Sequence, residues 1–162
     1  MVHIRSLPAR TAEFRAKTSK LIPLNNSTRW NSWSLMLSAA IETKSAVTSY
    51  VLENHDSLKL DELTADDWLY LQQIEEVLSP FHSTTLLGQG DNAQLSRTIV
   101  ILDVLKKHLT NARENISYSS EIHTRSKNAL RILSKYRDKI LSESPYYLAA
   151  IALHPSYQTS YF

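Results

Sequence analysis

The stretch TRWNSWSLMLSAAIETKSAVTSYVL, residues 28–52, carries the longest helical pattern in this chain of 162 residues. Side chains that can share one face recur in it at steps of three and four residues, the spacing of an amphipathic α-helix. These positions are Trp33, Met36, Leu37, Ala40, Ile41, Lys44, Val47 and Val51. Because Ser27 or Thr28 can cap its start, we predict one helix from Thr28 to about Leu52, the longest of the chain.

The residues before this helix give a weaker signal. Pro8 can open a short helix over residues 9–20, in which Phe14 is the only large apolar side chain. So thin an apolar stripe predicts a segment that is mobile or docks weakly. The proline and asparagines that follow predict a connector. We therefore divide the sequence into a basic N-terminal segment with its connector, residues 1–26, and a helical domain, residues 27–162.

Further amphipathic patterns follow downstream. In the first, Thr64 and Asp67 have the spacing of a capping box, and Pro80 should kink or end the helix. Residues 88–92 form a clear break. Three more patterns cover residues 93–116, 122–140 and 145–152. The sequence thus predicts an all-α fold, an irregular bundle of five or six helices around one shared core.

Glycine and cysteine usage narrows the class of protein. Only two glycines occur, whereas average usage is about 7%. Hairpin turns and phosphate-binding loops need glycine, so its scarcity disfavours strand-rich and nucleotide-binding folds. The lack of cysteine excludes disulfides and thiolate zinc sites. We expect a protein of the nucleus or otherwise the cytoplasm, and no apolar run is long enough to indicate a membrane.

Charge is segregated along the chain. Residues 1–30 hold six bases and one acid, residues 53–76 hold eight acids and one base, and residues 97–139 hold ten bases and four acids. Basic blocks of this kind are typical of nucleic-acid-binding surfaces. They also occur as ordinary solvated helix faces. Both interpretations stay open.

Residue types that carry catalysis are present, but not in catalytic patterns. Metal-dependent phosphoryl transfer needs carboxylates that converge on two ions, whereas the pairs Asp66-Asp67 and Glu75-Glu76 fall on predicted helix surfaces. Asp103, on the predicted helix of residues 93–116, can pair with Lys106 or Lys107 in a structural role. The six histidines include no i, i+4 pair, which disfavours a zinc site. No serine lies in a glycine-flanked elbow. We therefore expect no catalytic residue, no metal site, no cofactor and no small-molecule substrate.

Four ordered blocks resemble hAT-superfamily DNA transposases of the fungal type. The run Ser27-Thr28-Arg29-Trp30-Asn31-Ser32-Trp33 with Met36-Leu37 is similar to the family's TRWNS…ML signature, and Arg10, Phe14 and Ile22-Pro23 fit its lead-in. Asp67-Trp68, Leu78-Ser79-Pro80-Phe81 and Thr84-Thr85 resemble a second pattern. The close from Ser144-Pro145-Tyr146-Tyr147 through Leu153-His154-Pro155 to Tyr161-Phe162 resembles the last, with Gln158 where the family usually has lysine.

The resemblance implies a position within the family's architecture. It places this chain in the large helical insertion of a ribonuclease H-like domain, between the second catalytic aspartate and the catalytic glutamate. None of the acids of this chain aligns with the three catalytic carboxylates. The Cys-x-x-His element expected before this region has no counterpart. The resemblance therefore implies a truncated or domesticated transposase fragment, located in the nucleus and without catalytic activity of its own.

The resemblance assigns a candidate function to two residues only. In the family, an arginine-tryptophan pair at the position of Arg29 and Trp30 is associated with the DNA hairpin intermediate. Base stacking on an indole and a guanidinium-phosphate contact are physically sound. The alternative is that Trp30 packs in the core and Arg29 pairs with an acid. The partners implied are hairpin or single-stranded DNA ends, or, for a helical protein-interaction module, other transposase subunits.

Overall fold

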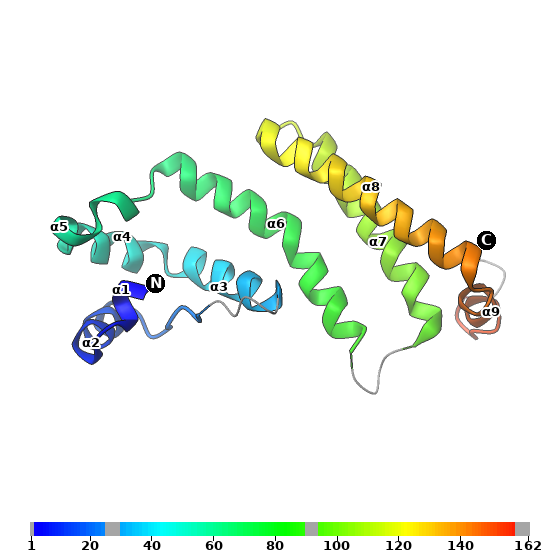
Figure 1. Ribbon diagram of the computed structural model, residues 1–162, viewed down its shortest axis with the longest axis horizontal. Helices are drawn as coiled ribbons and strands as arrows, with labels where there is room; N and C mark the ends of the chain where they lie inside the picture. The colour runs from blue at the N-terminus through cyan, green and yellow to red at the C-terminus, as the bar shows by residue number, and fades with distance from the viewer. Residues whose placement is uncertain (1, 25–29, 90–93, 158–162) are drawn as a thin grey trace. The chain divides into compact units, whose positions relative to one another are not determined.

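The computed structural model of the chain describes residues 2–24, 30–89 and 94–157 (Figure 1). Within these ranges the regular structure is helical and no strand occurs, which confirms the predicted all-α class. The elements are α1 (Val2–Arg5), α2 (Pro8–Lys17), α3 (Trp30–Glu42), α4 (Lys44–Glu53), α5 (His55–Leu58), the 3-10 helix η1 (Lys59–Asp61), α6 (Ala65–Leu87), α7 (Leu95–Glu114), α8 (Ser120–Glu143) and α9 (Tyr146–Ala152).

The chain forms two compact units, residues 1–75 (unit 1) and 76–162 (unit 2). This differs from the expectation of one shared core. Helical periodicity shows which side chains can be buried, but not which helix they pack against. The sequence-based division between residues 26 and 27 falls inside unit 1.

Two aromatic rings form the centre of unit 1. Phe14 of α2 and Tyr50 of α4 are both fully buried, with ring centroids 5.7 Å apart at 82°. Ile4 and Ile22 complete the buried cluster from either side of α2. The expectation of weak docking is therefore wrong. It counted only the apolar residues of the predicted helix, whereas two of the anchors lie outside that helix.

Polar contacts hold the same N-terminal segment to its neighbours. The Arg5 guanidinium donates to the Ile22 carbonyl at 2.7 Å. The Lys17 ammonium lies 2.6 Å from the Glu53 carboxylate of α4. These contacts join α1 and α2 to chain segments that lie far from them in sequence, and they fix the segment beside α4.

The long helix predicted over residues 28–52 is divided at Thr43. The helix α3 ends at Glu42, and α4 begins at Lys44. The Thr43 hydroxyl donates to the Ala39 carbonyl at 2.7 Å, and the Thr43 backbone has φ −103° and ψ 20°. A threonine hydroxyl that bonds to the preceding turn competes with regular helix geometry. The longest described helix is therefore α8, with 24 residues.

The helix α6 confirms one sequence prediction and corrects another. The Thr64 amide donates to the Asp67 carboxylate at 2.9 Å, and the Asp67 amide donates to the Thr64 hydroxyl at 3.1 Å. This is the predicted capping box. Of the two outcomes predicted for Pro80, a kink or an end of the helix, the end does not occur, because α6 runs to Leu87. A proline removes one backbone hydrogen bond, and the bonds of the other residues keep the helix formed on both sides.

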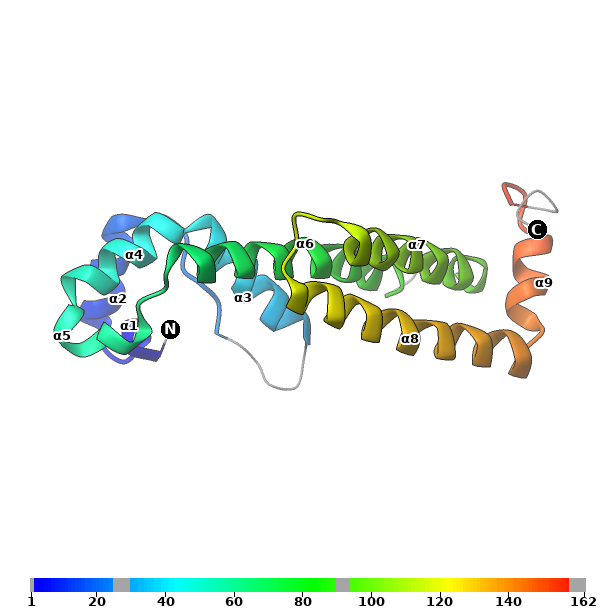
Figure 2. The ribbon, with the colours of Figure 1, turned by 90° about the horizontal axis from the view of Figure 1, so that it is seen from above.

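Unit 2 is built on an antiparallel helix pair. The helices α7 and α8 lie side by side in both ribbon views, and α9 contacts α7 (Figures 1 and 2). Their buried apolar side chains are Ile99, Leu105, Leu109, Ala112, Ile122 and Ile151. The Arg137 guanidinium of α8 binds the Asp103 carboxylate of α7, with Nε 2.6 Å from Oδ1. Sequence spacing suggested Lys106 or Lys107 as partners of Asp103, but the arginine of the facing helix takes that position.

Candidate nucleic-acid interface on helix α8

The two residues that the sequence nominated for DNA binding cannot be placed by the structure. Arg29 lies outside the described residues. Trp30 is the first residue of α3, but its side chain is also outside the described part of the chain. The neighbouring Trp33 is partly buried. The assignment of DNA contacts to Arg29 and Trp30 therefore stays a prediction.

A line of basic side chains follows the solvent face of α8. Lys127, Arg131, Lys135 and Lys139 recur at every fourth residue, and all four are exposed. We call these four residues the basic ladder. Four helical residues advance about 6 Å along the axis, so the ladder extends over about 18 Å. The buried side of α8 carries Ile122 and Ser126 instead.

The ladder is largely unpaired. Among the described residues, no carboxylate lies within ion-pairing distance of Lys127, Arg131 or Lys135. Lys139 lies 3.9 Å from the Glu143 carboxylate, a long and exposed pair that contributes little. The base of α8 that forms a close ion pair with another helix is Arg137, which faces α7. The charge of the ladder is thus available to an anionic ligand.

Two apolar side chains lie beside the ladder. Ile132 is 49% exposed and Tyr136 is 60% exposed, although large apolar groups are usually covered. Together with Arg131, Lys135 and Lys139 they line one shallow groove. Exposed aromatic rings beside bases are the features with which proteins stack nucleobases while holding phosphates. The groove therefore has the chemistry of a nucleic-acid contact.

Sequence reasoning found the basic block but not the ladder. The block of ten bases in residues 97–139 was evident. The sequence also contains the signal that could have identified the ladder, because its four bases are spaced four residues apart. Only the packing of α8 against α7 shows which side of the helix faces solvent, because the amphipathic stripe by itself does not reveal what covers it.

The paired carboxylates have structural roles. The Asp67 pKa is lowered because the Thr64 hydroxyl and amide both donate to the carboxylate. Glu75 accepts a hydrogen bond from the Ser38 hydroxyl at 2.8 Å. Glu76 accepts one from the Tyr118 hydroxyl at 2.7 Å. Burial, with the Glu76 contact, raises the Tyr118 pKa to about 12. These acids stabilise helix ends and helix contacts.

The described residues provide neither a metal centre nor a membrane-spanning helix. No group of three or more histidine, cysteine, aspartate or glutamate side chains could hold a metal ion there. No helix in the described ranges is long and apolar enough to cross a membrane.

Comparisons with known proteins give a curated relative and a family model that match parts of the chain. The protein of Talaromyces stipitatus named "Putative transcriptional regulator tpeD" is 31% identical over 122 residues, which cover 72% of this chain and 14% of that protein. The chain thus spans a small part of this curated relative. No solved structure gives a significant match. Residues 6–77 match the family model of the ZBED1 RNase-like helical domain, and this match lies almost wholly in unit 1.

Proposed function

We propose that this chain is a hAT-like, transposase-derived helical segment that binds nucleic acid and catalyses no strand transfer by itself. The match of residues 6–77 to the ZBED1 RNase-like helical domain supports the origin. The lack of catalysis follows from the resemblance, because the family's three catalytic carboxylates lie outside its helical insertion. The resemblance to DNA transposases is also the reason why we propose that the protein is located in the nucleus.

The observation that carries nucleic-acid binding is the basic ladder of α8. Its four cations lie on one solvent face over about 18 Å, a length that matches about five successive phosphates of one duplex strand. Tyr136 adds a ring that can stack on an unpaired base. The name of the Talaromyces relative, a transcriptional regulator, is consistent with a protein that acts on DNA.

A charge-removal series tests this proposal. Replacing Arg131, Lys135 and Lys139 by alanine removes three cations from one face of α8. Binding of a fluorescent hairpin DNA, followed by anisotropy at several salt concentrations, should weaken. The slope of log affinity against log salt should fall by about 2 to 3, because each lost phosphate contact changes it by about one.

A matched variant controls for net charge. Replacing Arg15, Lys59 and Lys106 by alanine removes the same charge from exposed positions outside α8. This variant should keep the wild-type salt slope within about one contact. Equal losses in the two triple variants would show that only overall charge matters, which contradicts a site on α8.

Separate variants test the residues that the sequence nominated. Trp30→Ala should weaken binding to hairpin or single-stranded DNA ends if the indole stacks on a base, by about 1 to 3 kcal/mol. Tyr136→Ala should weaken DNA binding by a similar amount if the tyrosine ring in the α8 groove stacks on a base. If one of these variants binds DNA with unchanged affinity, the ring that it lacks does not belong to the binding site. The other ring is then tested by its own variant.

A protein-interaction module is the second candidate function. Exposed apolar side chains near α9 favour it, because Tyr146 is 72% exposed and Leu153 is 83% exposed. Such side chains commonly mark contact surfaces. Light scattering should then show an oligomer that grows with concentration, and Tyr146→Ser with Leu153→Ser should abolish it. A strict monomer at high concentration excludes self-association as the function.

A further inference from the structure

Unit 1 contains a cavity that the proposed function does not use. Its volume is about 380 Å³. The walls come from α1, the segment after α2, the helices α3, α4 and α5, η1 and the start of α6, and they include Ile22, Val47, Leu58 and Trp68. Ligand sites of proteins commonly have volumes of about 300 to 1,000 Å³ and mainly apolar walls. The cavity therefore has the size and the lining of a small-molecule site.

One part of the lining carries polar atoms. Tyr50 lines the cavity and is fully buried, and its hydroxyl lies 3.3 Å from Nδ1 of His3. The other ring nitrogen of His3, Nε2, is buried and has no hydrogen-bond partner among the described residues. If the tyrosine donates to Nδ1, Nε2 carries a proton without an acceptor. If Nδ1 donates instead, Nε2 is an acceptor without a donor. A buried polar atom without a partner favours any ligand that supplies one.

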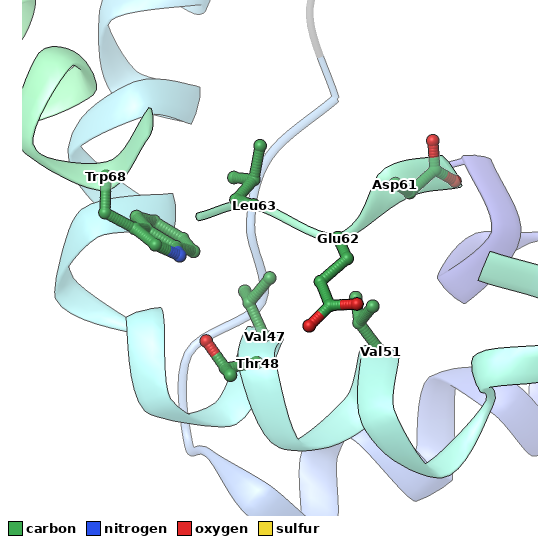
Figure 3. A pocket seen from close by; sticks show the side chains of 7 residues that line it. All are labelled: Val47, Thr48, Val51, Asp61, Glu62, Leu63 and Trp68. Carbon is green, nitrogen blue, oxygen red and sulfur yellow. The ribbon is translucent and has the colours of Figure 1, made fainter. Parts of the chain in front are cut away.

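The mouth of the cavity is apolar and acidic. Leu60 lines it and is 98% exposed, and Leu63 is 39% exposed. In the adjoining pocket of Figure 3, the side chains of Leu63 and Trp68 lie near Val47 of α4, with a carboxylate at Glu62. Exposed leucines at a rim gain from being covered by an apolar molecule. The acids Asp61 and Glu62 disfavour an anion there.

We propose that this cavity binds a small, uncharged, mainly aromatic or aliphatic molecule that carries one hydroxyl group. Apolar walls reject a charged ligand because they cannot replace its hydration. A hydroxyl group both donates and accepts, so it can pair with His3 in either tautomer.

A pair of probes tests the proposal on the full chain. In calorimetric titrations, 1-naphthol should bind saturably with one site per chain. Naphthalene, which has the same apolar body without the hydroxyl, should bind about tenfold more weakly, the effect of about one hydrogen bond. No saturable binding of 1-naphthol, or equal affinities for the two probes, overturns the proposal.

Substitutions locate the binding. Val47→Trp fills the cavity and should weaken 1-naphthol binding by at least about tenfold. Leu52→Trp adds the same ring to an exposed position of α4 outside the cavity and should leave binding unchanged. Circular dichroism checks that both variants keep their helices. Equal affinities in two folded variants would place the probe elsewhere.

A second variant keeps the test decisive if Val47→Trp does not fold. His3→Phe removes both ring nitrogens and keeps an aromatic side chain, so 1-naphthol should lose its tenfold advantage over naphthalene. Arg10→Ala, an exchange outside the lining, should retain that advantage. A hydroxyl preference that survives in His3→Phe shows that the ring nitrogens of His3 do not bind the hydroxyl group of the probe, and it contradicts the inference.

Discussion

The two units bury and expose their residues in different ways. Unit 1 has two aromatic rings in its core and contains all but the last residue of the acidic stretch 53–76, whose carboxylates form a helix cap and helix contacts. Unit 2 is an antiparallel pair whose outer face carries unpaired cations. The family match lies almost wholly in unit 1, whereas the candidate nucleic-acid surface lies in unit 2. The match to the family model and the candidate surface thus lie in different halves of the chain, whereas the relative from Talaromyces aligns over 72% of it.

A substitution of Phe14 should have the largest effect on the stability of one unit relative to the other. Phe14→Ala leaves a cavity in the core of unit 1 and should cost about 3 to 5 kcal/mol. All three tryptophans lie in residues 1–75, so tryptophan fluorescence follows unit 1 alone. Denaturant titration should shift the fluorescence transition to lower concentration, while part of the helical circular dichroism persists.

The persistence of that signal decides whether the units are independent. Tyr136→Ala, an aromatic truncation at an exposed position of unit 2, serves as the control and should leave the fluorescence midpoint in place. If Phe14→Ala unfolds both signals together, the units form one cooperative body and the contrast between them fails.

A smaller effect is expected at the ion pair of unit 2. Arg137 and Asp103 are partly buried, with side chains 26% and 35% exposed. Removing either partner should cost about 1 to 2 kcal/mol, between the values of exposed and of buried pairs. A double-mutant cycle with Arg137→Ala and Asp103→Ala, followed by circular dichroism, should give a coupling energy that stabilises the folded protein. Additive single effects would mean that the contact does not stabilise the α7-α8 pair.

The hydroxyl of Tyr118 should make unit 2 sensitive to alkali. Its pKa is raised from 10.0 to about 12 in the folded protein. The contribution of the protonated Tyr118 hydroxyl to folding stability is therefore fully present below pH 10 and is lost as the pH rises from 10 to 12. Tyr118→Phe should be less stable by about 1 kcal/mol at neutral pH. It should also lose less stability over that alkaline range, as measured by denaturant titrations followed by circular dichroism.

The capping box of α6 should show the smallest effect, at the acid end. The Asp67 pKa is lowered in the folded state, so its contribution is present above the ordinary value of 3.8 and is lost as the pH falls through the lowered pKa. Asp67→Ala should flatten the acid limb of the stability curve. Asp66→Ala, in the same helical turn but without a cap contact among the described residues, is the control. Identical acid limbs in the two variants contradict the role of the cap.

Local patterns account for the predictions that were confirmed. The all-α class follows from scarce glycine and from repeated helical spacing. The Thr64-Asp67 capping box needs only two side chains three residues apart. The predictions that failed concern competing local contacts or distant partners. Thr43 divides a helix through a bond to the turn before it, and Asp103 pairs with the facing helix.

The sequence by itself determined the helical class, the breaks at turns and the charge blocks, because these depend on neighbours within about four residues. Only the tertiary structure decided that Phe14 is a core residue, that the chain forms two units and that the basic ladder faces solvent. Each of these depends on which helix covers which face. That choice is made by packing between segments that are distant in the sequence, and a local pattern does not contain it.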